Sequence, residues 1–480
     1  MSPRRAVAML ALAMALAGSS AGLAPAGSDR SGGFDYLFPA LKERPDCLLP
    51  YRPDGGLDPA AQASLRALAR EIESPAATDG DSAIPAGITY LGQFIVHDVS
   101  FEATSKPDRV IAATTLRNLR TPVLDLDSLY GRGPLDQPYL YERLERRETA
   151  GARLLVGHRL NPADLARDTA GRATGRALIG DPRNDDNLLV SQLHLAFAAF
   201  HNAVVDRLAP AIADPWELFV EAQALVQRHY QWIVLNEFLP AVADPAVVEA
   251  VRAAPCRLLC GLGGPFVPVE ASMAALRFGH SMVRPLYTIA PGKVTSLEQM
   301  RGQFTFRNPL AAGVPVGWEV DWRRFFWRAS APPDANLARK IDTHVVPGLP
   351  TETGLLRAYA ARVPSGQCVA AGLGVPALTP AQLTAGRLDA TALRRDGGLL
   401  LERTPLWYYV LKEAEVLAGG ERLGPLGSRL VAEVLVNLAR ADPGSVLRTP
   451  GWRPTLGPRP GEFTMLDLLC AGNRLVPCPR

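Results

Sequence analysis

The sequence lacks the features of disordered chains and of nucleic-acid-binding proteins. Its 480 residues carry a formal net charge of only +3, and the basic residues are scattered singly rather than gathered in a patch that follows a phosphate backbone. It also has no long Ser/Gly linker and no evident internal repeat. Because 48% of the residues are hydrophobic and 21% are charged, the chain can fill a sizeable core. We therefore expect one large globular domain and no nucleic acid partner.

Long apolar runs are scarce, and the clearest one lies at the N-terminus. The chain begins MSPRRAVAMLALAMALAGSSAGLAPAG, with an apolar run over residues 6–17 and small residues near 24–26. A membrane span needs about 20 apolar residues, so this run is too short for an anchor. We predict a signal peptide over residues 1–26 and a domain over residues 27–480. The mature protein is then exported, secreted or periplasmic, without an integral membrane segment; the paired arginines leave the export route open.

Paired CxxC motifs of the zinc-binding type are absent, so a zinc site is not expected. The six cysteines are Cys47, Cys256, Cys260, Cys368, Cys470 and Cys478. An even number permits disulfides in an exported protein. The short spacings make Cys256–Cys260 and Cys470–Cys478 candidate pairs, but spacing alone leaves the connectivity open.

Strand signals are few, whereas helix signals are long and periodic. Residues 58–73 begin with Asp-Pro, which is typical of a helix cap followed by a first-turn proline. Apolar residues at spacings of three and four predict further helices over residues 187–208, 214–239, 405–418 and 427–439. Pro and Gly interrupt nearly everything between them. We expect a mainly α fold with long loops and little β structure, and a bound ion or large cofactor often stabilises such loops.

The first cluster of chemically useful residues is GQFIVHD, residues 92–98. A helix places Gln93 and His97 one turn apart on the same face. A histidine beside a bound peroxide can move a proton from one oxygen to the other at neutral pH. The alternative interpretation is a buried histidine with a structural role only.

The second cluster is GDPRNDDN, residues 180–187, which leads into the apolar helix predicted from residue 187. Acidic residues at a helix N-terminus complement the helix dipole, which accounts for Asp185 and Asp186. Arg183 is unfavourable there unless an anionic or electron-rich group faces it. Arg183 is therefore a candidate for stabilising developing negative charge.

The third cluster is Arg277-Phe278-Gly279-His280, in an otherwise apolar segment where the glycine leaves room for a close approach. Neutral imidazole is a common axial ligand of haem iron, so His280 is a candidate ligand. A buried structural histidine is again the alternative.

The fourth cluster, TPVLDLDSLYG over residues 121–131, offers oxygen ligands at alternating positions. Calcium binds six to eight hard oxygens, which carboxylates, a hydroxyl and a carbonyl can supply. The alternative is a surface strand with exposed aspartates.

Taken in order, these four clusters resemble the signature of the animal-type haem peroxidase superfamily, also called the peroxidase–cyclooxygenase superfamily, and the chain is similar to its bacterial members from about Gly87 onward. The resemblance implies a large, single-domain helical fold that binds haem b. It implies that Gln93 and His97 are distal pocket residues, with His97 as the acid/base and Arg183 as the distal arginine. It implies that His280 is the proximal ligand of the haem iron.

The resemblance also implies a calcium ion held beside the distal helix. Its protein ligands would be Asp98, Thr121, the carbonyl of Val123, Asp125 and Asp127. The ion would fix the residue that follows His97.

Further family-like segments lie closer to the C-terminus. Arg277 would lie near a haem propionate, and Arg357, in the stretch that ends in VPSGQ at residue 367, would approach a propionate as well. The stretch TPLWYYVLKEAE, residues 404–415, is similar to bacterial members.

The chain departs from the family pattern at the residues that modify haem. Val96 replaces an ester-forming aspartate, and Asn187 replaces a methionine that forms a sulfonium link. Asp186 stands where the family has a glutamate, so a single ester through Asp186 is the covalent link that the resemblance still allows. Gly354 replaces the asparagine that accepts a hydrogen bond from the proximal histidine, which leaves open how His280 is oriented.

These features predict a haem peroxidase that reduces hydrogen peroxide, oxidises a halide or a small organic donor, and acts in the response to oxidative stress. In the family, Gln93 would help to hold a halide. One alternative is a fatty-acid dioxygenase of the same superfamily, although Arg277 stands where cyclooxygenases carry their radical tyrosine. Another is a non-catalytic scaffold stabilised by calcium, which Gly354 and Val96 motivate. The donor and the oligomeric state are not encoded in the sequence.

Overall fold

The computed structural model describes residues 32–73, 80–142, 151–158, 161–168, 175–256, 258–259, 264–302, 313–328, 330–386, 390–474 and 478. The predicted signal peptide, residues 1–26, lies outside these described residues, as does Cys260. Contacts gather Ser31–Arg480 into one unit.

The described chain is mainly helical, which confirms the expected fold class. The longer helices are α2 (Pro59–Ile72), α3 (Ala86–Val99), α5 (Leu188–Leu208), α6 (Pro215–Ile233), α8 (Pro245–Ala253), α11 (Thr351–Ala360), α12 (Gly366–Leu373), α16 (Leu406–Ala418), α17 (Pro425–Ala441) and α18 (Met465–Ala471). The shorter ones are α4 (Asp127–Tyr130), α7 (Leu239–Val242), α9 (Val269–Ser272), α10 (Leu297–Gly302), α13 (Pro380–Leu383), α14 (Thr391–Arg394) and α15 (Leu399–Glu402).

Short 3₁₀ segments join many of these helices. They are η1 (Leu41–Glu43), η2 (Ala113–Thr115), η3 (Pro138–Leu140), η5 (Pro182–Asp185), η7 (Ala275–His280), η8 (Trp322–Arg324) and η9 (Asp396–Gly398). Two of them, η5 and η7, carry the arginine and histidine clusters found in the sequence.

The β structure of the described residues consists of two-stranded pairs. β1 (Phe34–Asp35) and β5 (Val267–Pro268) pair in parallel. The antiparallel pairs are β2 (Asp81–Pro85) with β8 (Leu337–Arg339), β3 (Val156–His158) with β4 (Asn161–Leu165), and β6 (Leu286–Ala290) with β7 (Lys293–Ser296). Such short ribbons cannot form a core of their own, so they serve as connections between helices.

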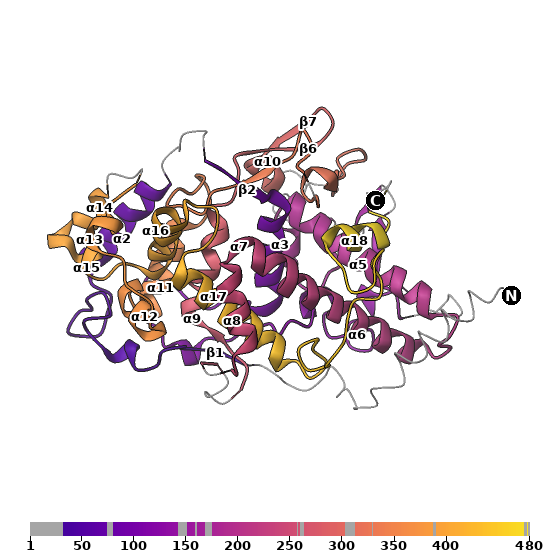
Figure 1. Ribbon diagram of the computed structural model, residues 1–480, viewed down its shortest axis with the longest axis horizontal. Coiled ribbons are helices and arrows are strands. Elements are labelled where there is room, and N and C mark those ends of the chain that lie inside the picture. Colours follow the sequence, from indigo (N-terminus) through magenta and orange to yellow (C-terminus); the bar gives the residue numbers. More distant parts are fainter. Residues whose placement is uncertain are drawn as a thin grey trace. The chain divides into compact units, whose positions relative to one another are not determined.

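The core lies where α3, α5 and α6 pack together, and Figure 1 shows α5 and α6 side by side. The side chain of Asn187 caps α5 by accepting a hydrogen bond from the backbone N–H of Val190. α5 is long and apolar enough to cross a membrane, yet 89% of its apolar window is buried inside the protein. That burial is what a central core helix requires.

The helices predicted over residues 58–73, 187–208, 405–418 and 427–439 are confirmed within two residues at their N-terminal ends. The prediction over residues 214–239 is correct in extent but missed a change of helix type. After α6 the backbone forms a π-helical segment, η6 (Val234–Phe238), before α7 begins. The apolar spacing does not reveal this change, because one wide turn shifts the pattern by only one residue.

Two disulfides join described cysteines. Cys470 pairs with Cys478, as the spacing indicated, and Cys47 pairs with Cys368 across 321 residues of sequence. The second bridge ties the segment before α2 to α12. Cys256 is also disulfide-bonded.

Candidate active site

One face of α3 is left partly open although the rest of the helix is buried. Gly92, Gln93, Val96 and His97 keep intermediate exposure, whereas Phe94 beside them is fully buried. Gly92 and Gln93 lie about one helical turn before Val96 and His97, so the four positions form one stripe along the helix. The stripe contains both distal residues that the GQF motif predicted.

His97 is neutral at physiological pH. Burial lowers its pKa to about 4, and the positive charge of Arg183 acts in the same direction. Its Nδ1 lies 2.9 Å from Oδ1 of Asn184, in the loop that the second sequence cluster forms. A neutral imidazole held in this way can accept a proton.

Arg183, in η5, lies directly beside His97. Its Nη2 donates to the backbone carbonyl of His97 at 2.9 Å, and Asp181 holds the same guanidinium at 2.7 Å. Burial alone would raise the pKa of Asp181, but Arg183, with smaller contributions from His97 and Arg120, outweighs burial, so the pKa is lowered. The guanidinium also stacks 4.1 Å from the ring centre of Phe101. The structure therefore brings His97 and Arg183 together.

Gln93 and Asp186 lie close to the same loop. Oε1 of Gln93 accepts a hydrogen bond from Nδ2 of Asn187 at 3.0 Å. The carboxylate of Asp186 forms an ion pair with Nε of Arg301 at 3.6 Å. The charge of Asp186 raises the pKa of His97, whereas the charge of Arg301 lowers the pKa of His280. This ion pair is thus close enough to act on both histidines.

His280 ends η7, which contacts α3. Burial, followed by the charge of Arg277, lowers its pKa to about 4, so its imidazole is also neutral. Its Nδ1 lies 3.0 Å from the backbone carbonyl of Arg277 and donates to it. Nε2 is therefore the nitrogen that can serve as a ligand atom.

Gly354, in α11, leaves its side-chain space to Trp407. A Cβ at residue 354 would lie 2.9 Å from Cζ3 of Trp407 and 3.6 Å from Nη1 of Arg277. The Trp407 ring packs edge-on against His280, with 5.3 Å between ring centroids. Nδ1 of His280 therefore has a backbone acceptor, and the ring of Trp407 occupies the space that a side chain at residue 354 would need.

Arg277 is a positive charge in a poorly compensated position. Burial, followed by the charge of Arg357, lowers its pKa to about 10, and its Nε has no hydrogen-bond partner among the described residues. Arg357 is better satisfied, because it forms an ion pair with Glu102 and its Nε donates to Oγ of Ser105 at 2.7 Å. Of these two arginines, Arg277 therefore has the greater need of an anionic ligand.

Asp98, Asp125 and Asp127 each point one carboxylate oxygen into a common space within 4.8 Å. Burial is the main cause that raises their pKa values, to about 8 for Asp98, to about 6 for Asp127 and well above the ordinary value for Asp125. The Thr121 hydroxyl donates to Asp125 at 2.7 Å, and Val123 is buried in the same loop. One buried and two half-buried carboxylates that repel one another are the kind of donor set that a hard cation prefers.

The strand alternative for this segment is wrong. Residues 122–125 form bends, and the helix α4 begins at Asp127. Leu126, at the turn, adopts a left-handed backbone conformation with φ 59°. A left-handed residue at this position breaks the extended conformation that a strand would need.

A chain of charges connects this acidic cluster to Arg183. Arg120 lies 3.4 Å from Asp127 and 3.5 Å from Asp181, which in turn holds Arg183. Asp98 follows His97 directly in α3. The acidic cluster is therefore connected to Arg183 through Arg120 and Asp181, and to His97 through Asp98.

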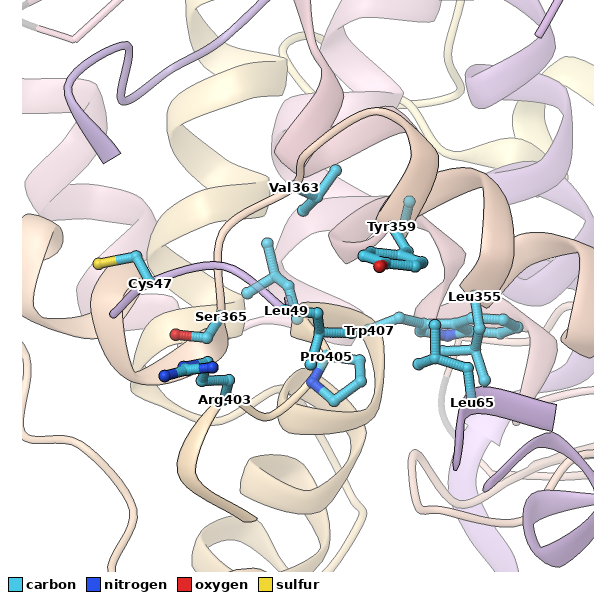
Figure 2. A pocket seen from close by; sticks show the side chains of 12 residues that line it. Cys47, Leu49, Leu65, Leu355, Tyr359, Val363, Ser365, Arg403, Pro405 and Trp407 are labelled. Atoms are coloured by element: carbon cyan, nitrogen blue, oxygen red, sulfur yellow. The ribbon is translucent and has the colours of Figure 1, made fainter. Parts of the chain in front are cut away.

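Trp407 also lines a small pocket, shown in Figure 2. Arg403 and Ser365 lie toward one end of it, and Tyr359 and Leu355 lie toward the other. Neither His97 nor His280 lines this pocket. It is a separate opening that shares only Trp407 with the candidate active site.

Sequence reasoning missed several residues that contact the site. Asn184 lies inside the GDPRN motif, so its position beside Arg183 was a usable signal. Trp407 lies in the family-like segment over residues 404–415, which marked the region but not the residue. Nothing in the sequence pointed to Arg301 or to Glu102.

The chain is similar to known peroxidases in sequence and in fold. Residues 99–345 match the family model described as animal haem peroxidase. A peroxidase-like protein of Margaritifera margaritifera is 26% identical over 288 residues, which cover 48% of this chain and only 35% of that relative.

The solved structures with a similar fold include peroxidase A of Dictyostelium discoideum, with a TM-score of 0.63 and 15% identity over 93% of this chain and 91% of that one. They also include a fatty acid α-dioxygenase of Oryza sativa, with a TM-score of 0.52 and 14% identity over 79% of this chain and 73% of that one. Identities this low show the fold alone. Because the family match covers more than half of the sequence, the chain belongs to the animal haem peroxidase family.

Proposed function

We propose that this chain is a haem-dependent peroxidase that reduces hydrogen peroxide and oxidises a halide or a small organic donor. The observation that carries the proposal is a neutral His97 held beside Arg183, together with a neutral His280 whose Nδ1 is engaged by a backbone carbonyl. His280 keeps Nε2 for a metal, which is the arrangement an axial ligand needs. Membership of the family supports haem and peroxide as the reactants.

The residues present fit a haem group. His280 would bind the iron through Nε2, and Arg277, with its unpartnered Nε, would receive a propionate. Arg357 would approach a propionate only by sharing its charge with Glu102. When bound, haem b would supply the redox chemistry, taking electrons from the donor and passing them to peroxide. For an ester to form through Asp186, its carboxylate would first have to leave the ion pair with Arg301.

His97 and Arg183 have complementary tasks in this scheme. The lone pair of a neutral His97 would accept a proton from the nearer oxygen of hydrogen peroxide and return it to the oxygen that leaves as water. Arg183 would stabilise the negative charge that develops on the leaving oxygen, because its guanidinium is already fixed by Asp181. Gln93, whose Oε1 is engaged by Asn187, would use its amide N–H groups toward a halide.

We also propose a structural calcium ion between Asp98, Asp125 and Asp127, with Thr121 and the carbonyl of Val123 as further ligands. The convergence of three carboxylates, that of Asp98 buried and the other two half-buried, supports it. Oxygen donors of this kind suit a hard divalent cation. Removal of the ion by a chelator tests the proposal, because loss of the ion should lower the stability of the folded protein.

Peroxidase activity is favoured over fatty-acid dioxygenase activity. The dioxygenase alternative needs a tyrosine radical next to the proximal histidine, and Arg277 stands three residues before His280. Its backbone carbonyl holds the His280 ring. Export of the mature chain is supported by the disulfides, since such bonds persist in oxidising compartments.

The experiment is an absorption spectrum of the calcium-replete protein, reconstituted with haem, before and after addition of hydrogen peroxide. We expect a Soret band that His280→Ala abolishes, and a peroxide-induced spectral change that His97→Ala slows by about 10²–10⁴-fold. His229→Ala, which removes a buried histidine elsewhere, is the control and should keep both. Absence of a haem band in folded wild-type protein would contradict the proposal and favour a calcium-stabilised scaffold.

A further inference from the structure

Asn184 stands between two buried histidines and bonds to both. Its Oδ1 lies 2.9 Å from Nδ1 of His97, and its Nδ2 lies 3.1 Å from Nδ1 of His194 in α5. Asn184 is fully buried and His194 is 3% exposed. The Asn184 and His194 part of this hydrogen-bonded series is therefore shielded from bulk water, and only its His97 end reaches the open face of α3.

His97 and His194 each present Nδ1 to the side chain of Asn184. The side-chain amide of Asn184 has one acceptor oxygen and one donor nitrogen, so in either orientation it accepts a hydrogen bond from one neutral imidazole and donates one to the other. The proton positions on the two rings are then coupled through the amide.

The direction decides whether His97 can act as a base. With Oδ1 toward His97, the Nδ1–H of His97 donates to Asn184, and Nε2 of His97 carries a lone pair. With the amide reversed, Nδ2 of Asn184 would donate to His97, and the proton of His97 would move to Nε2. Only the first arrangement leaves a base on the open face of α3.

The backbone on both sides of Asn184 is held by hydrogen bonds, which keeps its side chain between the two histidines. Its own N–H donates to the carbonyl of Asp181 at 3.0 Å. The next residue, Asp185, receives two hydrogen bonds from the buried Arg167, at 2.8 and 2.9 Å. On the far side, the His194 ring packs edge-on against Phe94, with 6.3 Å between ring centroids.

We propose that Asn184, supported by His194, is the positioning residue that holds His97 in the Nδ1–H form, with Nε2 free to accept the proton of peroxide. The proposal rests on the peroxidase function above, but it concerns a proton position that exists in the protein without haem. It assigns to His194 a task beyond core packing.

The first test reads the proton directly. Side-chain ¹⁵N NMR on histidine-labelled, calcium-replete protein without haem should find His97 protonated at Nδ1 and bare at Nε2. Asn184→Leu, which removes both partners, should give a mixture of the two tautomers. A wild-type His97 protonated at Nε2 would overturn the inference even if the protein proved to be a peroxidase.

The second test measures the reaction of the haem-loaded protein with hydrogen peroxide by stopped flow. Asn184→Leu should slow the spectral change by about 10- to 100-fold, which is typical when the partner that orients a functional histidine is lost, while the Soret band is retained. His194→Gln, which keeps an acceptor for the amide, should lose less than His194→Leu. Ser191→Ala, which removes a buried hydroxyl bonded only within α5, should keep the wild-type rate.

A charge substitution separates positioning from packing. Asn184→Asp keeps the acceptor for Nδ1 but places a carboxylate beside His97, which should raise the midpoint of the pH–rate profile by about 1–3 units. Arg183, Asp181 and Asp186 also act on His97, but they are the same in both proteins, so the comparison isolates residue 184. An unshifted midpoint with a folded protein counts against the proposal. If Asn184→Leu fails to fold, the near-isosteric Asn184→Asp and the variant His194→Gln decide whether the proposal holds.

Discussion

At the scale of single residues, the close approach of Gly354 and Trp407 gives a test that needs no cofactor. Gly354→Ala would set a methyl group 2.9 Å from Cζ3 of Trp407, and the ring cannot move away freely because Trp407 is buried. We expect a loss of about 1–3 kcal/mol in the free energy of unfolding, the usual cost of overpacking a core. Urea denaturation of the calcium-replete protein measures it.

Two controls keep this prediction specific to the contact. Gly302→Ala at the exposed end of α10 meets nothing within 4 Å and should change stability by less than about 0.5 kcal/mol. In a Trp407→Phe background the smaller ring vacates the contact, so Gly354→Ala should cost less there. Equal costs in both backgrounds would show that the tryptophan ring is not what excludes a side chain from residue 354.

The site residues found from the sequence were those that belong to contiguous motifs. Gln93, His97 and Asp98 share one heptapeptide, and Arg277 and His280 share one tetrapeptide, so their chemistry was visible in the residue order. Asn184 and His194 were not found as partners of His97, because the His97–Asn184 bond spans 87 residues. A hydrogen-bond chain between segments so far apart is a property of the tertiary structure. The backbone acceptor for His280 was equally invisible, since any residue supplies a carbonyl.

At the scale of elements, the helices predicted best were those with a cap and one clear apolar face. α2 begins after Asp58, whose side chain accepts from the backbone N–H of Ala61. The sequence did not predict that the His280 segment is a 3₁₀ turn, or that α6 continues into a π-helical segment. Both depend on how the turn fits its neighbours, which the periodicity of a single segment does not record.

The disulfide between Cys47 and Cys368 is the element-scale contact with the largest expected effect on stability. It ties the segment before α2 to α12 across 321 residues, so its loss frees a long loop in the unfolded chain. We expect the double variant Cys47→Ser/Cys368→Ser to lose about 2–5 kcal/mol of unfolding free energy under non-reducing conditions. Chemical denaturation gives the value.

The second described disulfide is a matched comparison. Cys470→Ser/Cys478→Ser opens a bridge that spans only 8 residues, and loop-closure entropy grows with length, so this variant should lose less. The opposite ranking would mean that strain or structure in the unfolded chain, rather than loop length, determines what the bridges contribute.

At the scale of the whole molecule, the acidic cluster joins parts of the chain that are otherwise only packed together. Asp98 belongs to α3, Asp125 to the loop before α4, and Asp127 to α4 itself. From α6, Gln227 donates to the backbone carbonyl of Asp125 at 2.6 Å. An ion at this point would connect the distal helix, the loop and the core helix, and through Arg120 it would also steady Asp181.

This arrangement makes calcium removal a test of the whole fold. Without an ion, three carboxylates face one another in a buried space, and burial already raises their pKa values. A ligand at about 100 times its dissociation constant stabilises the folded state by about 2.7 kcal/mol. Treatment with a calcium chelator at pH 7 should therefore lower the Tm by several degrees, and added calcium should restore it, while magnesium at the same concentration should restore less because it demands a tighter geometry.

A charge-neutralising variant distinguishes an ion site from a fortuitous acidic pocket. Asp125→Asn/Asp127→Asn removes two ligand charges, so its Tm should no longer respond to calcium. The same change also removes the repulsion between buried carboxylates, so in chelator the variant should melt at a higher temperature than wild type. The variant should thus have the higher Tm in chelator and the wild type the higher Tm in calcium, as measured by differential scanning calorimetry. A wild type indifferent to the chelator would refute the ion, and a variant less stable in both conditions would mean that these carboxylates act through their hydrogen bonds to Thr121 instead.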